Sequence, residues 1–206
     1  MGNTVGSREP IVVFTARKQQ TLEVLSRQIE VLQGSIIGDA YVAPLGKIQI
    51  EHTVRQRDYV MWKYRELASI SYPSLPAVVQ HNVVRSGKTY ESLRFWTRQF
   101  FRPLRDQFYQ GKQKVFPLEL ELTPLMVAVW YMDDGHLEAQ KHRCILATDC
   151  FDDHSLKRIV AAFQNAFSIN PVLRKSGKLV FNQENQIKFL NVISQHIIPS
   201  MKYKVY

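Results

Sequence analysis

The sequence predicts an α+β protein built from two similar halves. Three observations support this prediction. Two apolar helical stretches each end on a carboxylate, at Asp39 and at Asp134. Segments with helical and with alternating patterns follow each stretch in the same order, and landmarks of the two halves recur at a nearly constant offset. With 206 residues, 45% of them hydrophobic, the chain is large enough to bury a substantial core.

The charge of the chain predicts a polyanionic partner. Lys and Arg number 27 against 18 Asp and Glu, a net charge of +9, and residues 85–114 carry 8 − 2 = +6 of it. Nucleic acid is the commonest partner of so basic a chain. No apolar run reaches the roughly 20 residues of a membrane span, and no signal-peptide pattern opens the chain. The two cysteines, Cys144 and Cys150, fit a reducing compartment, so we expect an intracellular protein without a membrane partner.

The first half follows an N-terminal arm, residues 1–24. Apolar residues at helical spacing from Leu22 to Ile36 predict a helix that runs into the first acid-ended stretch. Gly34 and Gly38 lie four residues apart on it, which leaves one face without side chains. This spacing predicts that another helix approaches closely.

Two hairpins and a helix are predicted next. Residues 41–52 alternate around a proline-glycine turn, which indicates a hairpin with one polar face. Residues 55–68 have the pattern of an amphipathic surface helix, with Lys63 among the basic residues on its outer side. Residues 77–96 indicate a second hairpin around the turn at 86–88.

The second half repeats this order. Thr123 and Pro124 are an N-cap and a first-turn proline directly before the second acid-ended helix. The segments predicted after that helix are a hairpin at 136–148, a helix at 153–167, a hairpin at 171–182 and a helix at 183–196.

The offset between the halves can be checked on particular residues. Asp134 follows Asp39 by 95 residues, Gly177 follows Gly87 by 90, Lys114 follows Asp39 by 75, and Lys204 follows Asp134 by 70. This agreement predicts an N-terminal half at 25–110, a linker at 111–123 and a C-terminal half at 124–206.

The paired acids suggest a definite chemistry. Two carboxylates brought together repel each other unless a divalent cation lies between them. Oxygen ligands favour Mg²⁺, or Mn²⁺ in its place. Such ions lower the pKa of bound water and clamp the attacking and leaving oxygens of a phosphodiester. Lys114 and Lys204 would stabilise the charge that builds on the phosphate or help to orient the water. One such site per strand would break a duplex.

The acid-ended stretches resemble a known family. Residues 32–40 and 127–135 are similar to the two copies of the LAGLIDADG motif in single-chain homing endonucleases. The amino-acid sequence of residues 198–204 resembles that of the subgroup that contains the mitochondrial omega-intron endonuclease. The resemblance implies two αββαββα halves, with motif helices packed at a pseudo-two-fold axis and each four-stranded sheet in a DNA major groove. It also implies Mg²⁺-dependent double-strand cleavage that leaves 3′ overhangs, by a monomer acting on a long asymmetric target.

The resemblance also assigns roles to residues. The catalytic residues that it implies are Asp39, Asp134, Lys114, Lys204 and Gln49, of which the two acids also hold the metal. Asp133, next to Asp134, is the alternative ligand in the second motif; we assign the metal to Asp134 because it stands directly before Gly135. Val129 and Asp133 stand where the first motif has Gly34 and Gly38, so we expect the helix packing to be asymmetric.

Affinity for DNA is expected from basic residues near the second hairpin of each half. These residues are Arg85, Lys88, Lys175 and Lys178. Two other functions remain open: a non-cleaving protein of the same fold, either an RNA maturase or a DNA-binding regulator, and a zinc-dependent regulator. The zinc ligands would be His142, Cys144, Cys150 and His154, which lack a CxxC knuckle. The compartment is expected to be an organelle, mitochondrion or chloroplast, or the bacterial cytoplasm.

Overall fold

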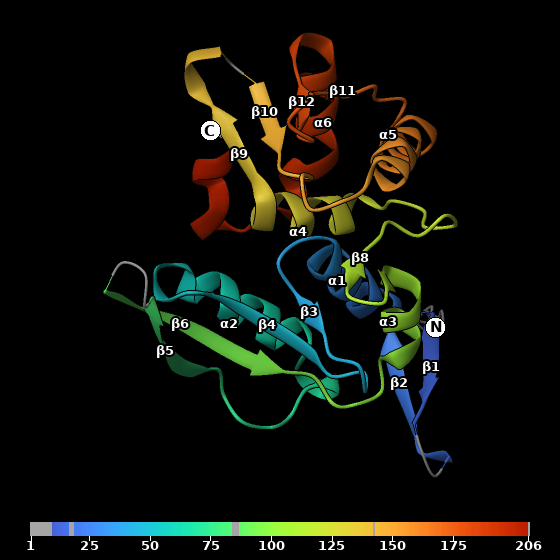
Figure 1. The fold of residues 1–206 in the computed structure, drawn as a ribbon, viewed down its shortest axis with the longest axis vertical. Helices are drawn as coiled ribbons and strands as arrows, with labels where there is room; N and C mark the ends of the chain where they lie inside the picture. Colours follow the sequence, from blue (N-terminus) through green and yellow to red (C-terminus); the bar gives the residue numbers. More distant parts are fainter. Residues whose placement is uncertain (1–9, 17–18, 84–86, 142, 206) are drawn as a thin grey trace, which may run out of the picture.

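The chain folds into two bodies that meet along a pair of helices, α1 and α4 (Figure 1). The computed structural model describes residues 10–16, 19–83, 87–141 and 143–205. Among these residues, no helix is both long enough and apolar enough to cross a membrane.

The first body has the predicted alternation of helices and hairpins. Its helices are α1 (Ser26–Ile37), α2 (Arg57–Glu66) and α3 (Arg102–Phe108), with 3-10 turns at Val54–Gln56 and Ala68–Ile70. Its strands are β3 (Tyr41–Val42), β4 (Ile48–Thr53), β5 (Ala77–Val83), β6 (Lys88–Trp96), β7 (Tyr109–Gln110) and β8 (Gln113–Lys114).

An additional hairpin precedes α1. It pairs β1 (Ile11–Thr15) with β2 (Thr21–Leu25), and Phe14 packs its ring 5.0 Å from that of Phe101. The prediction that helical structure extends back to Leu22 is therefore wrong. Residues 21–25 alternate between exposed and buried positions, so β2 buries Leu22 and Val24 on one face of the hairpin, and the helix begins only at Ser26.

The second body repeats the order of the first. Its helices are α4 (Pro124–Asp134), α5 (Asp153–Phe167) and α6 (Gln183–Ile193), with 3-10 segments at Ala139–Lys141, Ser194–His196 and Pro199–Lys204. Its strands are β9 (Gly135–Glu138), β10 (Arg143–Leu146), β11 (Val172–Leu173) and β12 (Leu179–Phe181). Thr123 caps α4 as predicted, because its hydroxyl accepts the N–H of Met126 at 3.3 Å.

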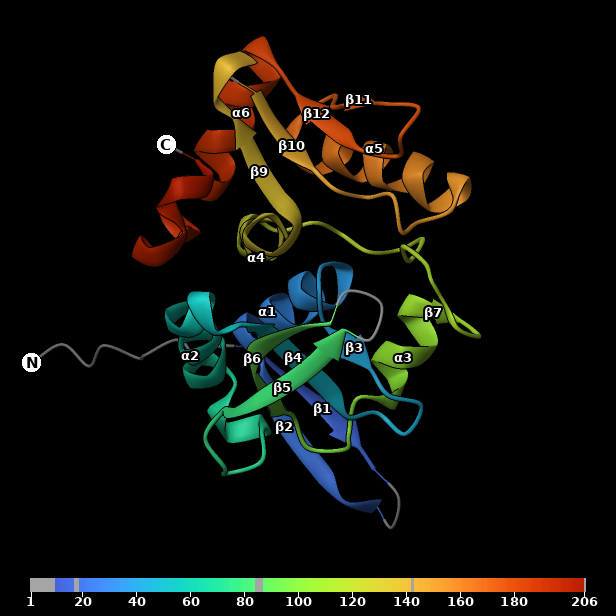
Figure 2. The same ribbon diagram turned by 60° about the vertical axis from the view of Figure 1, so that its left-hand side comes forward.

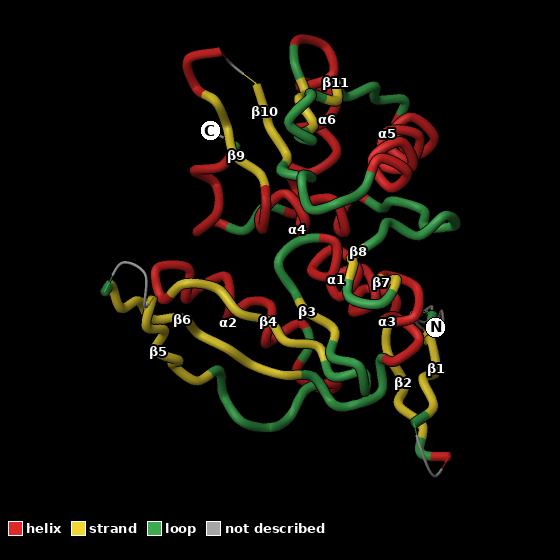
Figure 3. Tube along the Cα trace, in the orientation of Figure 1, coloured by secondary structure: helices red, strands yellow, loops and turns green. Residues whose placement is uncertain are grey.

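Sheet topology confirms that the halves are similar. The first sheet runs β3-β4-β6-β5 and the second β9-β10-β12-β11, with every neighbouring pair antiparallel. In each half the two hairpins therefore join through their second strands. The two sheets lie on opposite sides of the paired helices (Figure 3), which confirms the predicted α+β class.

Helices α1 and α4 lie side by side (Figure 2), and their close contact depends on glycine. A Cβ atom at Gly34 would lie 2.5 Å from the carbonyl oxygen of Met126 and 2.9 Å from Cβ of Val129. A Cβ atom at Gly38 would lie 2.6 Å from Oδ2 of Asp133. Val129 and Asp133 stand in the second motif where the first has glycine, so the side chains of α4 fill the gaps of α1. The predicted close approach is confirmed, and it is asymmetric.

The second body packs around α4. Every residue of this helix from Leu125 to Met132 is buried, as expected for a helix that is apolar on all sides. The ring of Trp130 lies 6.1 Å from that of Phe163, which in turn contacts Phe181 at 5.2 Å. This packing holds the C-terminal end of α4 in place at the seam between the halves.

Candidate functional site

The helices α1 and α4 each carry one of the predicted acids at the C-terminal end, at the seam between the halves. Asp39 is the second residue after the end of α1, and Asp134 is the last residue of α4. A carboxylate is normally disfavoured at the C-terminal end of a helix, where the backbone carbonyls already carry partial negative charge. The site must therefore supply positive charge to both helix ends.

Two lysines supply that charge. The ammonium group of Lys114 donates to the carbonyl oxygen of Gly38, at the end of α1, over 2.6 Å. The ammonium group of Lys204 donates to the carbonyl oxygens of Met132 at 2.6 Å and Asp133 at 2.9 Å, at the end of α4. The two predicted lysines thus occupy equivalent places, one at each helix end, beside the predicted acids.

The acids still repel each other. Burial, and then the neighbouring Asp39 carboxylate, raise the pKa of Asp134 to about 7. The pKa of Asp39 is also raised, by partial burial and then by Asp133. Burial in turn lowers the pKa of both Lys114 and Lys204. Burial is thus the first cause of all four shifts, and neighbouring carboxylates add to it at both acids. A bound cation would help to keep these carboxylates ionised.

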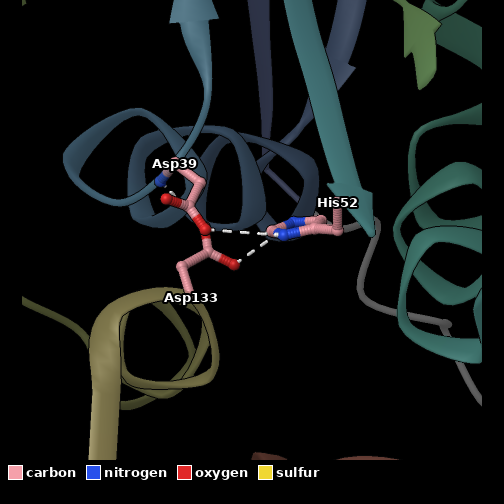
Figure 4. A group of neighbouring side chains, drawn as sticks. All are labelled: Asp39, His52 and Asp133. Carbon is pink, nitrogen blue, oxygen red and sulfur yellow. Dashed lines mark hydrogen bonds and ion pairs between the residues drawn. The ribbon is translucent and has the colours of Figure 1, made fainter. Parts of the chain in front are cut away.

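Asp133 lies in a buried network that was not predicted. Its Oδ1 accepts the hydroxyl of Tyr59 at 2.7 Å and the ammonium group of Lys63 at 2.7 Å, and the side chains of Lys63 and Asp133 are both 0% exposed. The ring of His52 lies beside the carboxylates of Asp133 and Asp39, 3.5 Å from an oxygen of each (Figure 4). Burial, and then Lys63, lower the pKa of His52 to about 4, so its ring is neutral at physiological pH.

The ligand atoms of Asp39, His52 and Asp133 lie within 4.8 Å of one another, a spacing that suits a metal. Lys63 already provides a cation there, 2.7 Å from Asp133 and 3.2 Å from His52. Burial opposes ionisation of Asp133, but Lys63 and its other donors nevertheless hold the pKa of that carboxyl below its usual value. A divalent ion in this place would face a buried positive charge. Asp39, whose side chain is 47% exposed, is the acid of this group that is open to a metal. Metal binding by Asp134 stays a prediction.

Gln49 lies on the other face of β4 from His52. Its amide nitrogen donates to Glu51 over 2.6 Å, and Glu51 also accepts a bond of 2.7 Å from Nε of Arg94. The structure thus places Gln49 on the polar face of the first sheet. Its catalytic role stays a prediction.

The basic residues predicted to bind DNA lie near hairpin turns. Lys88 begins β6 and Lys175 lies in the β11–β12 turn, both exposed, and Lys178 is half-buried directly before β12. Arg85, and His142 of the alternative zinc set, lie outside the described residues. Of the cysteines in that set, Cys144 is buried in β10 and Cys150 is exposed.

Lys63 shows what the sequence interpretation missed. Its assignment to the outer side of the helix is wrong. Tyr59 and Lys63 of α2 and Leu67, directly after the helix, are spaced by four and form a single buried stripe. A lysine in line with an aromatic and an aliphatic residue was the available signal. His52 continues the inward alternation of Ile48 and Ile50 along β4, which also could have been read from the sequence.

The raised pKa of Asp134 predicts a pH-dependent loss of folding stability. Between about pH 4 and pH 7 the Asp134 carboxyl binds more protons in the folded state than in the unfolded state. Its contribution to stability therefore falls as pH rises, and the loss is complete above pH 7. Allowing for solvent screening, we expect metal-free Asp134→Asn to be about 2 kcal/mol more stable than wild type at pH 7.5. The gain should vanish near pH 4. Thermal melts in EDTA across this range measure it, with the exposed Glu119→Gln as control.

Excess Mg²⁺ should narrow the gap, because metal bound by the native wild-type site stabilises it. A gain that is the same at every pH, or a loss of stability at pH 7.5, would contradict the account of Asp134.

Two similar halves, joined by paired helices that each bring an acid to a common seam, define the class of two-motif LAGLIDADG proteins. The chain belongs to the LAGLIDADG DNA endonuclease family, whose model matches residues 29–189. The fold is also that of a solved structure of the homing endonuclease I-WcaI bound to its DNA recognition sequence, with a TM-score of 0.79 and 23% sequence identity over 87% of this chain and 86% of that one.

Several curated proteins are similar to the chain at lower coverage of their own length. The cytochrome b mRNA maturase bI2 of Debaryomyces hansenii is 26% identical over 86% of this chain and 72% of its own. The protein of the same name from Saccharomyces cerevisiae is 26% identical, with 47% of its length covered. The RecA protein of Mycolicibacterium flavescens is 26% identical, with 46% of its length covered. The chain thus spans about half the length of the latter two.

Proposed function

We propose that the protein is a site-specific endonuclease that cuts both strands of a DNA duplex with the help of Mg²⁺ or Mn²⁺ and leaves 3′ overhangs. The observation that carries the proposal is the pair of acids at the ends of α1 and α4, each beside a lysine bound to the same helix end. One acid for each strand is the minimum for a double-strand break.

Asp39 and Asp134 would hold the metal. A divalent ion bound there supplies an activated water and stabilises the negative charge of the phosphodiester during cleavage. Lys114 and Lys204 are held against the helix ends, within reach of the same seam, where an ammonium group stabilises charge that builds on phosphate oxygens. Gln49 is proposed to assist from the polar face of β4.

The two sheets are proposed to lie against the major groove. Phosphate contacts from residues such as Lys88, Lys175 and Lys178 would provide salt-sensitive affinity, and side chains on the sheet faces would read base edges. The strands β5 and β6 have 7 and 9 residues, whereas β11 and β12 have 2 and 3. Halves so different suit a long asymmetric target bound by a monomer. The protein is proposed to act inside a cell, in an organelle or in the bacterial cytoplasm.

A second candidate function is that of a non-cleaving RNA maturase or DNA-binding regulator. Two similar proteins are named cytochrome b mRNA maturases, which favours this alternative. The paired acids and lysines favour cleavage, because binding alone would not require carboxylates that repel each other.

The test begins with selection of the target. Duplexes that bind the protein in EDTA are enriched from a randomised DNA library, and the selected sequence is cloned into a plasmid. We expect the wild-type protein to linearise this plasmid in Mg²⁺ or Mn²⁺ and not in EDTA. A plasmid with a scrambled target is the control.

Tight binding without any cut in either metal would contradict the proposal and favour the maturase or regulator. Competition by a structured intron RNA then separates these two, since a maturase binds the RNA and a regulator does not.

A further inference from the structure

Asp133 belongs to the second half of the chain but is bound by the first. Its Oδ1 accepts hydrogen bonds from Tyr59 and Lys63, both at 2.7 Å. Its Oδ2 accepts a second contact from Lys63 at 2.9 Å and the backbone N–H of Asp39 at 3.3 Å. The carboxylate therefore fixes the chain at the residue that carries the first acid, and it is itself fixed by the buried ammonium group.

The arrangement has no equivalent in the other half. Gly38 and Asp133 lie at the same offset, 133 − 38 = 95, that separates the two acids. A Cβ atom at Gly38 would lie 2.7 Å from Cβ of Asp133 and 2.6 Å from its Oδ2. Only one of the two positions can carry a side chain, so Asp134 receives no carboxylate contact from position 38.

His52 extends the asymmetry. Its Nε2 lies 3.2 Å from the ammonium group of Lys63, and its Nδ1 lies 3.5 Å from Oδ2 of Asp39. Because the ammonium group of Lys63 can only donate, we assign the ring proton to Nδ1, on the side of Asp39.

The equivalent of His52 in the second half follows from strand register. Tyr41 pairs with Gln49, three residues before His52, and His136 at offset 95 pairs with Ile145, three residues before Thr148. The hydroxyl of Thr148 donates to the carbonyl oxygen of Gly177. The second acid thus has no histidine at this position.

We propose that Asp133, held by Lys63 and Tyr59, is a positioning residue for Asp39 alone, so that cutting of the strand served by Asp39 depends on the buried ion pair and cutting of the other strand does not. This inference rests on the proposed function, in which the two acids serve one strand each.

The test uses the double variant Lys63→Met/Asp133→Asn, which removes both charges together so that neither is buried alone. The two strands of the selected duplex carry different labels, and single-turnover rates are measured in Mg²⁺ at saturating protein. The variant Asp39→Asn first identifies the strand that Asp39 serves. We expect the double variant to slow cleavage of that strand by about tenfold to a hundredfold, because a displacement of a catalytic group by about 1 Å lowers the rate by up to about a hundredfold. The other strand should change by less than about twofold, and nicked duplex should accumulate.

Two comparisons separate positioning from general damage. The surface pair on α6, altered as Lys188→Met/Glu184→Gln, should leave the ratio of strand rates unchanged. Thermal melts and the Kd for the selected duplex in EDTA report folding and binding of each variant. If the double variant does not fold, His52→Leu and Tyr59→Phe are measured for the same strand preference.

Equal slowing of both strands, or no slowing of either, would overturn the inference. So would equal loss of both strands in Asp39→Asn, because the acids would then not divide the strands between them. A wild-type protein that binds and never cuts instead overturns the proposed function, and the inference falls with it.

Discussion

Replacing Asp39 or Asp134 by asparagine is expected to lower linearisation of a target plasmid by roughly a thousandfold or more. A bound metal ion contributes several kcal/mol to phosphodiester hydrolysis, and each 1.36 kcal/mol is a tenfold change in rate. Linearisation needs both strands to be cut, so either variant alone suffices. Binding should be unchanged or tighter, because each variant removes a negative charge that faces the phosphates. Plasmid cleavage and binding in EDTA measure the two effects separately.

The matched control is Glu119→Gln, which changes an exposed carboxylate in the segment between the halves. It should cut at the wild-type rate. If Asp39→Asn and Asp134→Asn also cut at the wild-type rate, these residues are not the metal-binding acids.

The variant Lys63→Met is expected to destabilise the protein by about 3–5 kcal/mol, because it leaves the buried carboxylate of Asp133 without its cation. For a chain of this size the loss corresponds to a fall in Tm of about 10 °C. The double variant Lys63→Met/Asp133→Asn should recover most of it, since neither charge then remains buried. Thermal and urea unfolding in EDTA measure the difference.

The control for this cycle is Lys188→Met, which breaks an exposed ion pair on α6 and should barely change the Tm. A Lys63→Met variant as stable as Lys188→Met would show that the buried ion pair does not hold the halves together.

Much of the fold could be predicted because its signals are local. The cap at Thr123, the apolar stripe of α5 and the hairpin turns each depend on residues close together in the sequence, and α5 spans the predicted 153–167. The N-terminal hairpin was less predictable, because Leu22 forms a helical spacing with Leu25 and an alternating one with Val24. Tertiary contacts such as that between Phe14 and Phe101 favour the strand.

The site was predictable only where the motifs recur. Asp39, Asp134, Lys114 and Lys204 have counterparts in both halves, so the repeat pointed to them. Lys63 and His52 have no such counterparts. Their roles depend on contacts with Asp133, which lies 70 residues from Lys63 and 81 residues from His52 in the sequence. A single sequence does not encode that pairing in any local pattern.

The repeat also explains why the acids tolerate helix ends that disfavour them. Lys114 and Lys204 donate to the final carbonyls of α1 and α4, and thus offset the partial negative charge there. These lysines supply part of the positive charge that the two acids require. We expect a bound metal to supply the rest.

The most direct test of the account is to map the ends produced when the wild-type protein meets its selected duplex in Mg²⁺, with each strand labelled separately. We predict one cut in each strand, at staggered positions that leave 3′ extensions, and no cut by Asp39→Asn/Asp134→Asn. A duplex that stays bound with both strands intact, in Mg²⁺ and in Mn²⁺ alike, would contradict it.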